Sequence, residues 1–166
     1  MVSYYFGSKE KLYEDVINRK LISSDTIVKS VEQHTSSMDK LFAMVDLYIE
    51  KFFERRLFQN IIFREMAMNQ RTAMAEKITV QVHKNFLLAY DIIQTGIDNK
   101  EFKKVDIELT VMSIIGIVRM YTTSGTMACK ILKVEDESEA FGKKQKDRLR
   151  KHLRQLLINH LGIESK

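Results

Sequence analysis

The chain of 166 residues contains no proline, and this absence limits its fold more than any other feature. At the usual proline frequency of about 5%, about eight would be expected. Because proline removes a backbone N–H donor and clashes with the preceding turn, its absence suits a chain that is helical nearly throughout. The length is that of one domain, or of one domain with a fragment of another attached.

The composition excludes several classes of protein. A single cysteine, Cys129, allows no internal disulfide and no cysteine pair for a zinc site. The first twenty residues hold no apolar run and do not resemble a secretory signal. The longest apolar stretch runs only from Val111 to Val118, whereas a membrane span needs about 20 residues. We therefore expect a cytoplasmic protein that contacts no membrane and needs no metal or other cofactor. The net charge of +5 permits contact with polyanions but is low for an autonomous DNA-binding domain.

Apolar residues recur at helical spacing along nearly the whole chain, which predicts an all-α, multi-helix bundle. The clearest stripe has steps of four, four, three, four and four residues: Ile78, Val82, Phe86, Ala89, Ile93 and Ile97. A second stripe contains Leu41, Val45, Tyr48 and Phe52. We expect the helices at about residues 9–29, 38–53, 57–68, 78–98, 105–124 and 143–161.

Polar residues between the stripes predict where the helices begin and end. Ser8 is placed to cap a helix that starts at Lys9, and Ser37 to cap the next one. Asn99 is expected to end the fourth helix in a left-handed conformation. The β-branched residues 111–118 are also compatible with a strand, but their length and lack of turn signals favour a helix buried on several sides.

The most specific signal lies near the N-terminus, where residues 3–13 read SYYFGSKEKLY. This segment resembles the junction between the recognition helix and the following helix in TetR/AcrR-type transcriptional regulators. Weaker matches are the triplet Phe63-Arg64-Glu65 and the segment from Ile97 to Asp106, in which the family usually has glycine where this chain has Lys100. The resemblance implies that residues 1–8 are a remnant of the DNA-binding helix-turn-helix and that residues 9–166 form the ligand-binding and dimerisation domain. Residues 9–29 would be the helix that connects the two parts.

By this resemblance, Ser3, Tyr4, Tyr5 and Lys9 would contact DNA, with Lys9 at a phosphate beside the helix N-terminus. The alternative is a hydrophobic staple of Tyr4 and Phe6 over the next helix. Family members carry a few dozen residues before the motif, and a helix-turn-helix needs both of its helices. We therefore expect the intact parent protein to bind a double-stranded DNA operator, but not these 166 residues alone.

The resemblance also implies that a small-molecule effector binds in the helical core. Its binding would change the distance between the two DNA-binding parts of a dimer. Apolar pockets with a few polar groups are common sites of this kind. The candidate ligand-binding residues are Tyr48, Phe52, Phe58, Ile62, Met66, Phe86, Tyr90, Met112, Ile115 and Arg119. Each apolar member, and the high methionine content of nine, is more simply explained by ordinary core packing.

Arg119 and His83 are polar residues on helices whose other residues are mainly apolar. Arg119 follows the most apolar segment, so its guanidinium needs an acidic partner such as Glu65, an exposed rim position or an anionic ligand. His83 lies on the polar side of its helix and is expected to face solvent. The basic run from Lys143 to Arg154 is most simply a solvated face, with nucleic-acid contact as the alternative.

The last two long helices are expected to pair with their copies in a homodimer. The predicted interface residues are Ile114, Val118, Tyr121, Leu149, Leu153, Leu156 and Leu157. The alternative is that both stripes face the core of their own subunit.

No catalytic motif is recognised: the chain has no GxSxG, Walker or HExxH sequence and no di-iron pattern. We therefore expect no enzyme. The sequence favours a TetR-type regulator, most simply a repressor released by a small apolar ligand. The alternative is a dimeric helical carrier of small molecules or lipids that does not bind DNA.

Overall fold

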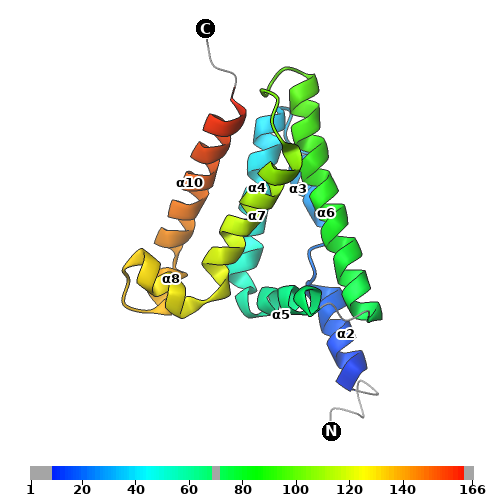
Figure 1. The fold of residues 1–166 in the computed structure, drawn as a ribbon, viewed down its shortest axis with the longest axis vertical. Coiled ribbons are helices and arrows are strands. Elements are labelled where there is room, and N and C mark those ends of the chain that lie inside the picture. The colour runs from blue at the N-terminus through cyan, green and yellow to red at the C-terminus, as the bar shows by residue number, and fades with distance from the viewer. Residues whose placement is uncertain (1–8, 69–71, 163–166) are drawn as a thin grey trace.

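The computed structural model describes residues 9–68 and 72–162, and within these ranges every regular element is a helix. The all-α bundle expected from the periodicity is therefore confirmed. The helices are α2 (Lys9–Lys20), α3 (Ser24–Val31), α4 (Ser37–Glu54), α5 (Arg56–Ala67), α6 (Ala73–Asp98), α7 (Ile107–Thr123), α8 (Gly125–Leu132), α9 (Glu137–Ala140) and α10 (Lys143–Leu161). Figure 1 shows α4 and α7 between α6 and α10, with α5 crossing the end at which α2 lies.

The single helix expected over residues 9–29 is wrong, because the structure divides it into α2 and α3. The backbone of Ser23 is extended, and its hydroxyl accepts a hydrogen bond from the amide of Thr26. Serine competes in this way for free amides and so begins a new helix. The expectation that Ser37 caps α4 is also wrong by one residue. The cap is Ser36, whose hydroxyl accepts a hydrogen bond from the Asp39 amide.

The apolar side chains form two separate buried clusters. The main core joins α4, α6, α7 and α10 and includes Ile49, Ile93, Val111 and Leu153. A second cluster holds α2 against α5 and α6 through Ile17, Phe58, Ile62 and Ile78. The segment between α2 and α3 joins the two, since Leu21 packs on the second cluster and Ile22 on the main core.

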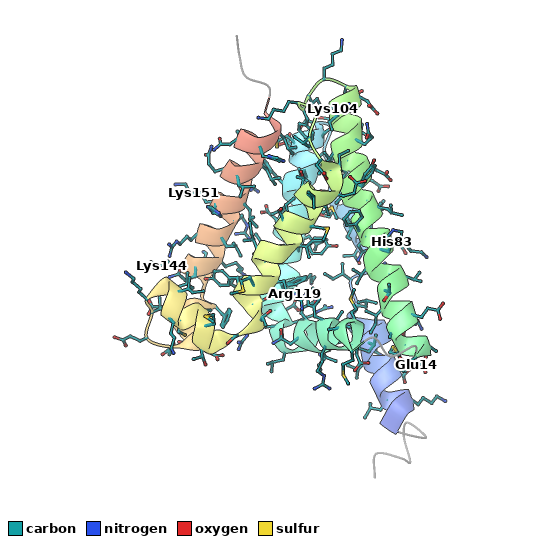
Figure 2. All side chains as sticks on the ribbon, in the orientation of Figure 1. Glu14, His83, Lys104, Arg119, Lys144 and Lys151 are labelled. Atoms are coloured by element: carbon teal, nitrogen blue, oxygen red, sulfur yellow. The ribbon has the colours of Figure 1, made fainter. Side chains whose placement is uncertain are left out.

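Helix α10 is attached to α4 by charge as well as by its leucines. Arg150 Nε lies 3.1 Å from Asp46 Oδ1, and Lys146 Nζ lies 2.9 Å from Glu50 Oε1. Arg154 also pairs with Asp46. Three of the seven Lys and Arg residues of the basic run are therefore ion-paired within the subunit, while Lys144 and Lys151 point away from the bundle (Figure 2).

The left-handed residue at the end of α6 is Lys100 and not Asn99. Lys100 has φ 60°, whereas Asn99 stays right-handed with φ −79°. This turn lets the amides of Glu101 and Phe102 donate to the carbonyl oxygen of Gly96, at 2.8 and 3.0 Å. A side chain at Lys100 thus occupies a position that favours glycine.

We expect Lys100→Gly to raise the free energy of unfolding, by up to about 1 kcal/mol, because it removes the steric cost of the left-handed conformation. Urea denaturation measures the change. Asn99→Gly is the matched control, since that residue is right-handed and glycine there only loses more entropy on folding. A Lys100→Gly variant no more stable than the unmodified chain would contradict the expectation.

Candidate ligand-binding site

An apolar cavity of about 20 Å³ lies in the main core, between α4, α6 and α7. Its lining comes from α4 (Leu41, Met44, Val45, Tyr48, Phe52), α6 (Asn85, Ala89) and α7 (Val111, Ile114, Ile115, Val118). Each helix supplies residues three or four apart, which is the spacing of one helix face. This volume suffices for about one water molecule, so any larger ligand must displace side chains.

Two of the lining side chains, Tyr48 and Asn85, are polar, and among the described residues none that lines the cavity is charged. Burial raises the pKa of the Tyr48 phenol, and a hydrogen bond with Asn85 opposes this with a smaller effect. Tyr48 is therefore neutral near pH 7 and can both donate and accept a hydrogen bond. The site suits an uncharged, largely apolar ligand, because transfer of an unpaired charge to this environment is costly.

Asn85 also connects the cavity to the start of the chain. Its Nδ2 donates to the carbonyl oxygen of Ile22 at 2.9 Å, in the segment between α2 and α3. Its Oδ1 accepts from the Ser24 hydroxyl at 3.1 Å and from Gln81 Nε2 at 3.0 Å. Only 4% of Asn85 is exposed, and such a buried amide needs these partners.

The sequence predicted part of this lining and missed the rest. Tyr48, Phe52 and Ile115 do line the cavity. Asn85 was missed, although it lies four residues before Ala89 and seven after Ile78, on the apolar face of α6. A polar residue on an otherwise apolar helix face was the signal that could have identified Asn85 as part of the site.

The other predicted ligand residues lie elsewhere. Phe58 and Ile62 are buried in the second cluster, and Met66 packs against it. Phe86 and Tyr90 pack partly buried against the main core without lining the cavity. Met112 is 59% exposed, so its assignment to the pocket is wrong. The period of an amphipathic helix identifies a buried face but not which of two clusters receives it.

Arg119 and His83 both lie at the surface (Figure 2). The guanidinium of Arg119 lies over the ring of Phe63, with its Cζ 4.1 Å from the ring centroid, which is a cation–π contact. It therefore needs neither Glu65 nor an anionic ligand. The expected exposure of His83 is confirmed, and its ring stacks on Phe86 with centroids 6.5 Å apart.

The predicted dimer interface is largely wrong, because most of its residues lie in the subunit's own core. Ile114, Val118, Leu149, Leu153 and Leu157 are at most 7% exposed. Leu156 is partly buried, and the half-buried Tyr121 donates its hydroxyl to the carbonyl oxygen of Ala140 at 2.9 Å. The stripes of α7 and α10 both face inward, and the five buried side chains are not available to a partner subunit.

Helix α7 packs against α4, α5 and α6, in line with the expected burial on several sides, but a different face of it is open. Leu109, Met112 and Met120 are 56–59% exposed, and Gly116 lies between them with steps of three and four residues. We call these four residues the exposed α7 stripe. Exposed Met127 and Ile131 follow on the next helix, α8. Apolar residues gathered in this way are typical of contact surfaces.

The predicted DNA-contacting residues lie mostly outside the described part of the chain. This is true of Ser3, Tyr4 and Tyr5, and of the Lys9 side chain, although the backbone of Lys9 begins α2. Within residues 9–68 and 72–162, no helix has the length and hydropathy needed to cross a membrane. The same residues contain no group of three or more His, Cys, Asp or Glu side chains placed to hold a metal ion.

Comparison with known proteins gives a likeness of fold. No protein-family model and no curated protein sequence matches the chain. Among solved structures, the chain is similar to a TetR transcriptional regulator from Chloroflexus aurantiacus J-10-FL, with a TM-score of 0.67 and 17% sequence identity. The match covers 98% of this chain and 79% of the other. The two proteins therefore share a multi-helix fold.

Proposed function

We propose that the chain is the effector-binding and dimerisation portion of a TetR-type transcriptional regulator, a repressor released by a small apolar ligand and acting in the cytoplasm. The observation that carries the proposal is the apolar cavity with two polar side chains, Tyr48 and Asn85, inside a fold shared with a TetR regulator. The SYYFGSKEKLY motif at residues 3–13 spans the start of this domain and resembles the junction with the DNA-binding helices in such regulators. Next to a complete helix-turn-helix, Ser3, Tyr4, Tyr5 and Lys9 would contact the operator.

The test is an electrophoretic mobility shift assay on the DNA that flanks the gene. The protein is expressed from the complete genomic reading frame that contains these 166 residues. A sequence-preferring complex that weakens with rising salt and with a cavity ligand is the expected result. A protein that binds a cavity ligand but forms no such complex would contradict repression and favour the helical carrier.

Dimerisation is proposed through the exposed α7 stripe and not through the leucines of α10. In a two-fold dimer, the same stripe from each subunit would meet its copy. Gly116 would allow close approach of the two helices, because no atom lies within 4 Å of the place where a side chain would begin. Burial of Met112 would remove a large apolar side chain from water.

We expect Met112→Glu to raise the dimer dissociation constant about 10-fold or more, because it would place like charges in a symmetric apolar contact. Sedimentation velocity over a range of concentrations measures the constant. Leu87→Glu is the matched control, since Leu87 is also exposed at mid-helix but lies on α6. Equal effects of the two substitutions, or no effect of the first, would contradict this surface as the interface.

A further inference from the structure

Helix α10 carries positive charge that the rest of the subunit does not neutralise. Its segment from Lys143 to Arg154 holds seven Lys and Arg residues and one acidic residue, Asp147. Three of the seven cations are ion-paired with α4, and Asp147 lies 2.6 Å from one of these three, Arg150. Within the described ranges, the other four form no ion pair: Lys143, Lys144, Arg148 and Lys151.

Three of these unpaired cations lie in a row on the outer side of α10. Lys144, Arg148 and Lys151 are separated by four and three residues, which is the spacing of one helix face. All three are exposed, and Lys144 and Lys151 point away from the bundle on the same side (Figure 2). At about 1.5 Å per residue, the three positions span about 10 Å along the helix. We call these three residues the α10 basic row.

The α10 basic row stays open to solvent in the subunit. Helix α10 lies at the edge of the bundle and packs chiefly on α4 and α9 (Figure 1). The net charge of the whole chain is +5, so apart from the four unpaired cations of α10 its charges nearly cancel. Acidic residues at positions 135–139 precede α10, and for this reason Lys143, at the first position of the helix, is not counted in the row.

The side chains exposed along the row indicate the kind of partner that fits it. Between Lys144 and Lys151 the exposed positions carry only lysine, arginine and the paired Asp147, and the exposed large apolar residue of α10 is Ile158, further along the helix. A protein partner would need an apolar or aromatic centre, and lysine is depleted in such contacts. Recognition of RNA uses unpaired bases stacked on aromatic rings, or contacts to 2′-hydroxyl groups, and α10 has no Phe, Tyr or Trp. Cations without these features are typical of contacts to the phosphates of duplex DNA.

We propose that the α10 basic row binds the phosphate backbone of double-stranded DNA without reading its sequence. The duplex carries one negative charge per about 1.7 Å of its axis, so a row of about 10 Å faces several phosphates. Binding releases the counterions condensed on those phosphates, and this release makes the contact favourable. The contact uses neither the cavity nor a helix-turn-helix, so the inference is independent of the proposed function. In a regulator it would keep the subunit close to DNA during the search for a specific site.

The test is fluorescence anisotropy of a labelled DNA duplex of about 20 base pairs, titrated with the 166-residue chain at about 20 to 200 mM NaCl. Three phosphate contacts predict a slope of about −2.7 when the logarithm of the binding constant is plotted against that of the salt concentration. A duplex of scrambled sequence is expected to bind equally well. No binding at the lowest salt concentration, or a clear preference for one duplex, would overturn the proposal.

The double variant Lys144→Gln/Lys151→Gln removes two of the three contacts. It is expected to weaken binding about 10-fold or more at the lowest salt concentration and to make the slope shallower by about 2. Lys77→Gln/Lys84→Gln is the matched control, because it also removes two exposed lysines seven residues apart, on α6. The control is expected to keep the slope and to change the affinity by less than about 2-fold. Equal losses in both variants would show attraction to the net charge alone and would contradict the row as the site.

Polyglutamate and an RNA duplex of the same sequence, at equal charge concentration, separate DNA from other polyanions. DNA is expected to bind more tightly than either. Tighter binding of polyglutamate would identify an acidic polypeptide as the partner, and tighter binding of RNA would identify RNA; each result would overturn the assignment to DNA. A sequence-preferring complex formed by the complete reading frame would still support the proposed function after any of these failures.

Discussion

Replacing Leu153 by alanine is expected to lower the free energy of unfolding by about 2–5 kcal/mol. Leu153 lies on α10 with 0% of its surface exposed, in the main core with Ile49 and Leu157. Loss of its side chain removes buried apolar surface and leaves a cavity that close-packed neighbours fill only in part. Urea or thermal denaturation at several protein concentrations measures the change.

The control for Leu153→Ala is Ile158→Ala on the same helix, where 44% of the side chain is already exposed. That substitution is expected to cost about 0.5 kcal/mol or less within the subunit. The comparison separates a buried position from an exposed one on the same helix. If Leu153→Ala left the subunit's stability unchanged and acted only through the monomer–dimer equilibrium, the placement of α10 would be wrong.

Gly96→Ala is expected to lower the free energy of unfolding by about 1–2 kcal/mol, although alanine is the better helix former. A methyl group on Gly96 would lie 2.3 Å from Cδ2 of Phe102. Phe102 is only 3% exposed, so its ring cannot move without disturbing the main core. Overpacking of this kind outweighs the gain in helix propensity, and the midpoint of urea denaturation should fall.

Gly116→Ala provides the contrasting control, because it lies in α7 with nothing within 4 Å of the added methyl group. There the helix propensity of alanine acts alone and should raise the stability of the monomeric subunit by about 0.5–1 kcal/mol. Opposite signs for the two substitutions are the expected result. A rise in stability for both substitutions would show that Phe102 does not pack closely on Gly96.

The sequence predicted the helices well because their buried faces repeat every three or four residues. The stripe on α6 contains Ile78, Ala89 and Ile93, and all three are buried. The last helix likewise buries Leu149 and Leu161 as its pattern required. Periodicity of this kind depends only on local geometry and needs no knowledge of the neighbouring helices.

Tertiary features were predicted less well, because they depend on which helices meet. The spacing that predicted a buried position for Leu153 did not tell whether this residue packs in its own subunit or against a partner subunit. Apolar neighbours in the sequence predicted a pocket position for Met112, yet no helix of the described residues covers its side of α7. The break at Ser23 depended on one serine competing for an amide, which is a weaker signal than the apolar stripe around it.

The division of the apolar side chains into two clusters has a consequence for local stability. Among the described side chains of α2, Ile17 is the buried apolar one, and it packs with Phe58, Ile62 and Ile78. Regions with fewer buried contacts open at lower free energy, as separate cooperative units. Helix α2 can therefore detach and redock while the larger cluster stays intact. The chain therefore combines a larger buried cluster with a smaller one that opens at lower free energy.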